Sequence, residues 1–351
     1  MIRNWGLNPL EADLDHILTH MDGWWEELRC KRIFITGGTG FFGCWLLESF
    51  VWANDKLGLG ATAVVLTRNP EAFRKKSPHL ATRSDIRFLV GDICSFEFPE
   101  GEFSHIVHGA TETSIHSNHP DRLSMFDKNV QGARRVLEFA RFSGAQRFLL
   151  TSSGAVYGKQ PPEMTHIPED YRGGPETVDL GSSYGQGKRV SEFLCAAYAQ
   201  KYGLEILIAR CFAFAGPYLS MNANYAIANF IRDALQGGPI YIQGDGTPYR
   251  SYLYAADLVI WLWTILFKGK TCRPYNVGSD VDLTIAQLGQ EVASVLAPGT
   301  EIRIAKQPEP GKPAERYVPS TQRAQSELGL CQRIGLQDTI RRTGLWYSEL
   351  T

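Results

Sequence analysis

The sequence predicts an α/β fold in which a doubly wound parallel sheet carries a smaller C-terminal α/β lobe. Three observations predict it. Short β-branched apolar runs alternate with helical segments from residue 32, a glycine-rich loop follows the first of these runs, and after residue 212 the pattern loosens and becomes rich in Gly, Pro and Tyr. Regular alternation indicates parallel strands with helices on both faces. Right-handed crossovers then favour the doubly wound topology.

The runs predict strands at 32–36, 62–67, 86–90, 105–108, 147–151 and 205–209. Before them, Leu10, Leu14 and Ile17 recur at helical spacing, which predicts an amphipathic helical extension over residues 1–30, packed on the main body. We expect the sheet domain to span 31–212, with 250–280 returning to it. The second lobe is expected at 213–249 and 281–351.

The composition narrows the classes of partner. The chain has 351 residues and a formal net charge of −1, which gives no electrostatic case for binding nucleic acid or an anionic membrane. The most apolar run, 258–267, is about half the length of a membrane-spanning helix, and the N-terminus lacks the layout of a signal peptide. Seven scattered cysteines show no metal-ligand spacing. These features predict a cytoplasmic protein with reduced thiols and no metal.

The segment 33–43, IFITGGTGFFG, leads from the first strand into a helix. It fits GxGxxG through Gly38 and GxxGxxG through Gly37. In this context, glycines let the backbone approach a pyrophosphate at the positive end of a helix. The segment therefore predicts a Rossmann-type NAD(P) site. Its expected cofactor-binding residues are Gly37, Gly40, Phe41, Phe42 and Gly43.

The ends of the next two strands bear on the choice of cofactor. The second strand ends at Thr67-Arg68 with no carboxylate at its tip, and an arginine there suits the extra phosphate of NADP. We therefore expect NADP rather than NAD, unless Arg68 is only a solvated surface residue. Asp92 and Ile93 follow the third strand, where they would meet the adenine; Asp92 could equally cap a helix.

Tyr184 and Lys188 stand four residues apart at the start of an expected helix, so they share one face. A nearby ammonium favours the phenolate, and we therefore expect a lowered pKa for Tyr184 and an acid/base role on an alcohol or ketone. This spacing alone also occurs by chance. However, the fifth strand ends at Ser153, and hydroxyls at the carboxyl edge of such a sheet lie where substrates bind.

With Gly37–Gly43, Ser153, Tyr184 and Lys188 in place, residues 31 to 350 resemble the extended short-chain dehydrogenase/reductase family, in its branch of nucleotide-sugar epimerases, dehydratases and 4-keto reductases. The resemblance implies that Ser153 bonds the sugar oxygen, Tyr184 is the acid/base, and Lys188 binds the cofactor ribose. Hydride then passes between sugar C4 and the nicotinamide. It further implies a homodimer whose interface is formed by the helices that bear Asn129 and Tyr184. It also implies further contacts between the protein and the cofactor. The additional cofactor-binding residues are His108, Ala110 and Asn129.

The second lobe contains GDGTPYR at 244–250, which is similar to the family segment whose arginine holds the sugar-nucleotide pyrophosphate. Arg250 is therefore expected to bind substrate, although an internal salt bridge is the alternative. Arg316 fits a substrate-binding position more loosely. Glu112, after the fourth strand, is expected to line the sugar pocket or to supply an acid/base group from another direction.

The chain departs from the family at Gly154 and Ala155, where 4,6-dehydratases carry an Asp-Glu pair and decarboxylases keep a glutamate at the second position. Neither residue can transfer a proton, so dehydration by the usual route is disfavoured. Ala213 also replaces an asparagine that contacts the substrate in many relatives. We therefore expect an NDP-sugar 4-epimerase, with an NADPH-dependent 4-keto-6-deoxysugar reductase as the alternative. A 4,6-dehydratase or a non-catalytic dinucleotide-binding relative is less favoured, and Tyr184 argues against the latter.

Overall fold

A computed structural model describes residues 8–111 and 121–348. Its centre is a parallel sheet of seven strands in the order β11-β6-β5-β4-β1-β2-β3, and all six expected strands are part of it. Strand order reverses between β1 and β4, which places a crevice at their carboxyl ends. The strands are β1 (Arg32–Thr36), β2 (Thr62–Thr67), β3 (Ile86–Val90), β4 (His105–His108), β5 (Arg147–Ser153), β6 (Glu205–Cys211) and β11 (Pro274–Val277).

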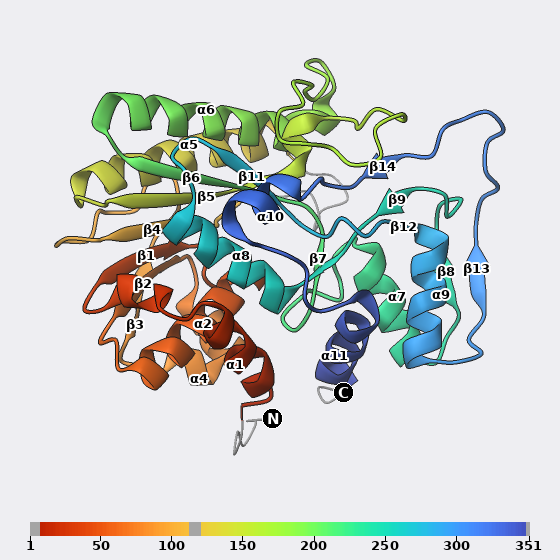
Figure 1. The fold of residues 1–351 in the computed structure, drawn as a ribbon, viewed down its shortest axis with the longest axis horizontal. Helices are drawn as coiled ribbons and strands as arrows, with labels where there is room; N and C mark the ends of the chain where they lie inside the picture. Colours follow the sequence, from red (N-terminus) through yellow and green to blue (C-terminus); the bar gives the residue numbers. More distant parts are fainter. Residues whose placement is uncertain (1–7, 112–120, 349–351) are drawn as a thin grey trace.

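Helices cover both faces of this sheet (Figure 1). One face packs α2 (Phe41–Leu57) and α8 (Ala255–Lys268) against Ile33, Ile35 and Val65. The other packs α5 (Arg122–Phe142) and α6 (Ser183–Tyr202) against Phe34 and Ile106. Successive residues of β1 thus serve opposite cores, as strand alternation requires. The short helices α3 (Pro70–Lys76) and α4 (Pro78–Ala81) connect β2 to β3.

The N-terminal segment forms α1 (Glu11–His20) and the 3₁₀ helix η1 (Trp24–Leu28). Helix α1 packs against α2 and α8 through Leu14 and Ile17, and the Trp25 ring lies 5.3 Å from that of Trp263 on α8. Because α8 lies between the sheet and this segment, its apolar residues are buried on all sides. Among the described helices, none combines the length and apolarity needed to cross a membrane.

The second lobe has its own apolar core, formed mainly by α7 (Ala226–Leu235) and α9 (Ile285–Leu296), with β8 (Ile240–Ile242) and α11 (Leu336–Ser348) contributing. Strand β8 pairs with β13 (Ile302–Ile304), and a small sheet runs β12 (Leu283–Thr284), β9 (Tyr249–Arg250), β14 (Arg316–Tyr317). Between these elements the chain returns to the main sheet through α8 and β11. The connecting elements are β7 (Phe214–Ala215), β10 (Leu253–Tyr254), α10 (Gln322–Leu328), η3 (Gly154–Tyr157) and η4 (Leu180–Ser182).

Candidate active site

The glycine loop between β1 and α2 is packed too closely for side chains. Gly37 has φ +72°, and a Cβ there would lie 2.6 Å from the amide nitrogen of Ala110. A Cβ on Gly43 would lie 2.3 Å from the Gly37 carbonyl oxygen. Gly40 caps α2 without a side-chain hydrogen bond, so the amides that open the helix receive no bond from the cap residue and have no side-chain partner among the described residues. Close backbone approach and free amides at a helix N-terminus fit a dinucleotide pyrophosphate.

The expected adenosine-binding residues lie at the ends of β2 and β3. The Thr67 hydroxyl is buried and accepts a hydrogen bond from the Asn69 amide over 3.3 Å. Arg68 is exposed and forms no ion pair with another residue that the structure describes. One Asp92 oxygen accepts a hydrogen bond from the Cys94 amide over 2.9 Å, so it caps the turn after β3. These side chains face the crevice end of the sheet, and their contacts with a cofactor stay predictions.

Buried polar side chains support the end of β4. His108 Nδ1 lies 2.8 Å from the Thr36 hydroxyl, which also accepts a hydrogen bond from the Ala110 amide over 3.1 Å. Burial, helped by the charge of Lys188, lowers the pKa of His108 to about 3, so its ring is neutral at neutral pH. Asn129 is buried on α5, where its side-chain oxygen accepts a hydrogen bond from the Thr111 hydroxyl over 2.9 Å.

The three expected catalytic residues come together at the carboxyl edge of the sheet. Ser153 ends β5, and Tyr184 and Lys188 occupy successive turns of α6. Lys188 is buried and donates a hydrogen bond from Nζ to the Thr151 carbonyl over 2.8 Å, and this Nζ lies 5.9 Å from the centre of the Tyr184 ring. The Ser153 hydroxyl interacts with the phenol of Tyr184. This group can exchange a proton with an alcohol or carbonyl oxygen placed between Ser153 and Tyr184.

The prediction of a lowered pKa for Tyr184 is wrong. Burial raises the pKa of Tyr184, and the groups that act in the opposite direction are the hydroxyls of Ser153 and Thr111. Lys188 is itself buried, which lowers its pKa to about 8. Desolvation disfavours the charged forms of both side chains and is the largest influence on the pKa of each.

In the second lobe, Arg250 lies on β9 beside Tyr317 of the paired strand β14. Its guanidinium donates a hydrogen bond to the Tyr249 carbonyl over 2.7 Å and pairs with no acidic side chain among the described residues. The alternative of an internal salt bridge therefore has no described partner. Burial raises the pKa of Tyr317 to about 12, and the charge of Arg250 acts in the opposite direction. Since Arg250 pairs with Tyr317, whose hydroxyl lies beside Gly154, it stands one strand away from the end of β5 that carries Ser153.

Arg316 is placed differently from Arg250. Its guanidinium lies 3.8 Å from the Tyr249 ring and forms an ion pair with Asp282 over 2.7 Å. Adjacent residues of a strand face opposite sides, so Arg316 points away from the side to which Tyr317 points. The structure does not bring Arg316 to Ser153, and its substrate-binding role stays a prediction. Glu112 lies outside the described residues.

Two aromatic residues at the site were missed in the sequence. A Cβ on Gly154 would lie 2.7 Å from both the Tyr317 hydroxyl and the Phe212 ring, and the two rings are 4.7 Å apart between centres. They therefore occupy the space that a side chain at residue 154 would need. No local pattern singles out Tyr317, because β14 has only two residues and pairs with a strand that is distant in the chain.

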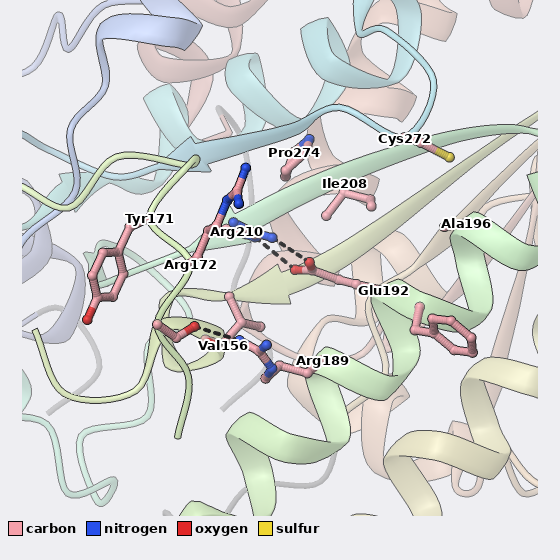
Figure 2. A pocket seen from close by; sticks show the side chains of 12 residues that line it. Val156, Tyr171, Arg172, Arg189, Glu192, Ala196, Ile208, Arg210, Cys272 and Pro274 are labelled. Atoms are coloured by element: carbon pink, nitrogen blue, oxygen red, sulfur yellow. Dashed lines mark hydrogen bonds and ion pairs between the residues drawn. The ribbon is translucent and has the colours of Figure 1, made fainter. Parts of the chain in front are cut away.

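A pocket of about 410 Å³ lies between α6 and the strands β6 and β11 (Figure 2). Inside it, Arg210 forms a two-pronged ion pair with Glu192, at 3.0 and 2.7 Å, and also bonds the Tyr157 hydroxyl over 3.0 Å. None of Ser153, Tyr184 and Lys188 lines this pocket. Across the described residues, no group of three or more His, Cys, Asp or Glu side chains is arranged to hold a metal ion.

Residues 33–278 match the model of the NAD dependent epimerase/dehydratase family. The chain is 30% identical over 320 residues to UDP-glucuronic acid decarboxylase 1 of Danio rerio, covering 91% of this chain and 73% of the relative. It is also 30% identical to UDP-glucuronic acid decarboxylase 3 of Arabidopsis thaliana, covering 88% and 86%.

Solved structures share the fold. DesIV, a dTDP-glucose 4,6-dehydratase from Streptomyces venezuelae with NAD and TYD bound, has a TM-score of 0.76 at 26% identity, covering 91% of this chain and 97% of that one. A UDP-glucuronic acid 4-epimerase from Bacillus cereus in complex with UDP-glucuronic acid and NAD has a TM-score of 0.76 at 20% identity, covering 91% and 100%.

Proposed function

Because the chain belongs to the NAD-dependent epimerase/dehydratase family, we propose that it acts on a nucleotide-activated sugar and inverts the configuration at C4. One observation carries the proposal. The acid/base group of Ser153, Tyr184 and Lys188 is complete, whereas Gly154 and Ala155 supply no proton-transferring side chain and Tyr317 and Phe212 fill the space beside Gly154. The site is therefore equipped for exchange at one alcohol carbon, and positions 154 and 155 do not carry the carboxylates that the resemblance places there in the family's eliminations.

Each residue of the site has a separate role in the proposed reaction. Tyr184 accepts the proton of the C4 hydroxyl and later returns it, and Ser153 holds the same oxygen by a hydrogen bond. Arg250 holds the nucleotide pyrophosphate through its planar, permanently charged guanidinium. Nicotinamide dinucleotide, bound at the glycine loop, would accept the C4 hydride and return it. Lys188 is placed on the Tyr184 face of α6 to hold the nicotinamide ribose.

We propose NAD as the cofactor. The family is NAD-dependent, and the solved relatives named above carry NAD. The preference for NADP expected from Arg68 has no support in these comparisons, and the Arg68 side chain is exposed at the tip of β2. Mass spectrometry of dinucleotide released from protein purified without added cofactor tests this directly: NADP(H) would restore the first expectation.

The relatives at 30% identity raise decarboxylation as a second candidate, since both are UDP-glucuronic acid decarboxylases. The residue against it is Ala155, which stands where the resemblance places a glutamate in those enzymes. A 4-keto reductase would use the same Ser153, Tyr184 and Lys188, but it would consume reduced cofactor. The three reactions thus differ in product mass and in cofactor balance.

The test is incubation of the protein and NAD with UDP-glucuronic acid, UDP-glucose and dTDP-glucose, followed by mass spectrometry and NMR. A product of unchanged mass and inverted C4 supports the proposal. Loss of carbon dioxide or of water from the substrate would overturn it. A parallel incubation with NADPH and a nucleotide 4-keto-6-deoxysugar tests the alternative: stoichiometric oxidation of NADPH there, with no epimerisation of the first three sugars, would support the reductase.

We also propose that two copies of the chain associate through α5 and α6. These helices pack on each other, and their outer surface exposes Leu123, Phe142 and Phe193 by 65–71%. Exposed large apolar side chains on two helices that pack together are typical of an interface. Sedimentation equilibrium of the wild type and of Phe193→Glu tests this: a monomeric wild type would refute it.

A further inference from the structure

Three hydroxyl groups meet where the two lobes of the molecule face each other. Tyr184 comes from α6, Ser153 from the end of β5, and Tyr317 from β14 in the second lobe. The Ser153 hydroxyl interacts with both phenols. The acid/base role of Tyr184 and Ser153 described above gives Tyr317 no part, although it touches the same serine.

The position of Tyr317 is fixed by its packing. Its hydroxyl lies 2.7 Å from the point that a Cβ on Gly154 would occupy, and its ring lies 4.7 Å from that of Phe212. The pairing of Tyr317 with Arg250 holds the backbone of β14 in register with β9. The phenol can therefore reach Ser153 only because residue 154 has no side chain.

The hydrogen-bonding capacity of Ser153 limits how it can serve two phenols. A serine hydroxyl has one hydrogen to donate and two lone pairs that accept. One lone pair accepts the Ala155 amide over 3.1 Å, as Ser153 caps η3. One lone pair and one hydrogen remain. Ser153 must therefore accept from one phenol and donate toward the other.

We propose that Tyr317 is a positioning residue that donates its phenolic hydrogen to Ser153 and thereby directs the Ser153 hydrogen toward Tyr184 and the reacting sugar oxygen. Burial raises the pKa of Tyr317 to about 12, so it remains a donor at neutral pH. A hydrogen bond donated to a phenolate stabilises the charged form. Tyr317 thus favours ionisation of Tyr184 through Ser153. The inference rests on the acid/base role proposed for Tyr184.

The other groups around the two phenols do not supply this effect. Cys211 of β6 faces both phenols, and its own pKa is raised by burial. Arg250 of β9 and Tyr225 before α7 face Tyr317. On α6, Lys188 lies one turn from Tyr184, and the Thr111 hydroxyl after β4 acts to lower the pKa of Tyr184. Once Tyr184 has given up its proton, Tyr317 is the group among these described residues that interacts with Ser153 and still has a hydrogen to donate to it.

The test is the pH profile of kcat for Tyr317→Phe, with Tyr241→Phe as control because the Tyr241 phenol is exposed on β8, outside the site. We expect the ascending limb of the Tyr317→Phe profile, where kcat rises as Tyr184 ionises, to move up by about one pH unit, because a hydrogen bond to a charged group is worth roughly a tenfold change in equilibrium. kcat should therefore fall about tenfold at neutral pH and recover toward wild type in alkali. Binding of NAD and the melting temperature should not change.

A Tyr317→Phe profile that overlays the wild type would overturn the inference, as would an equal loss of kcat at every pH. Gly154→Ala offers a second route to the same result, since its methyl group must displace the phenol; it should move the ascending limb in the same direction. If the wild type turns over no nucleotide sugar, the proposed function is wrong, and this inference, which rests on it, is wrong as well. An active wild type with an unaltered Tyr317→Phe variant would reject the inference alone.

Discussion

Lys188 Nζ donates a hydrogen bond to the backbone carbonyl of Thr151 over 2.8 Å, and this bond links the catalytic helix α6 to strand β5 two residues before Ser153. The lysine is 3% exposed. An ammonium held in this way fixes the distance between α6 and the strand end that carries Ser153. The same burial makes the charge costly, which gives the protein a measurable pH dependence.

Replacing Lys188 by methionine should abolish turnover and remove part of the pH dependence of stability. Burial lowers the pKa of Lys188 from 10.5 to about 8, so below pH 8 both folded and unfolded chains bind the proton and the full cost of burying the charge is present. Between pH 8 and 10.5 the unfolded chain binds more protons, so stability rises with pH. The gain is about 3 kcal/mol.

Urea unfolding from pH 7 to 10 measures this gain as the difference between wild type and Lys188→Met. Lys201→Met, at an exposed position near the end of the same helix, is the matched control and should titrate as the wild type does. Parallel stability curves for the wild type and Lys188→Met would contradict the prediction.

Replacing Tyr184 by phenylalanine should lower kcat by about 10²- to 10⁴-fold, the usual contribution of a positioned acid/base group. The phenol is not part of the glycine loop, so the affinity for NAD should stay within twofold. Tyr202→Phe at the end of α6 is the control, because its ring is 42% exposed and lies away from Ser153. Steady-state kinetics and a fluorescence titration with NAD suffice; full activity in Tyr184→Phe would remove the proposed mechanism.

The two arginines of the small sheet should behave differently. Arg250→Ala is expected to weaken binding of a nucleotide sugar by about 10- to 100-fold, since hydrogen bonds to charged groups contribute about 1.5–3 kcal/mol. Arg316→Ala removes a guanidinium already engaged with Asp282 and Tyr249, so it should weaken binding much less. Calorimetry with UDP-glucose compares them. A larger loss in Arg316→Ala would reverse the assignment.

The periodic parts of the fold were predictable from sequence, and the lobe contacts were not. Strand β1 alternates buried residues between two cores and is followed by glycines, so its position and the loop were evident. Strand β14 has only two residues, and its pairing with β9 joins positions 67 residues apart in the chain, at Tyr317 and Arg250. No local pattern encodes such a pairing, which is why Tyr317 was missed.

The spacing of Tyr184 and Lys188 did not suffice to predict the direction in which the pKa of Tyr184 shifts. The spacing of four residues from Tyr184 to Lys188 correctly places both on one face of α6, but local spacing does not reveal how deeply that face is buried. Desolvation turned out to be the largest influence on the pKa of each side chain. The spacing therefore located the pair correctly but predicted the wrong direction for the pKa shift of Tyr184.

In the glycine loop, close packing should make a Gly→Ala substitution costly, whereas the same substitution at an uncrowded glycine should have no effect. A methyl group at Gly43 would lie 2.3 Å from the Gly37 carbonyl, so α2 must move away from the loop in Gly43→Ala. We expect this variant to lose at least tenfold in NAD affinity and about 1–3 kcal/mol in stability, as overpacked sites do.

Gly238→Ala is the control, since a Cβ there meets nothing within 4 Å and its backbone is not in the left-handed region. It should leave NAD affinity and the melting temperature as in the wild type. Titration with NAD and thermal unfolding of the two variants decide the matter. If Gly43→Ala bound NAD as tightly as Gly238→Ala, the amides that open α2 would not be the dinucleotide site, because a loop displaced from the helix cannot keep the same backbone contacts.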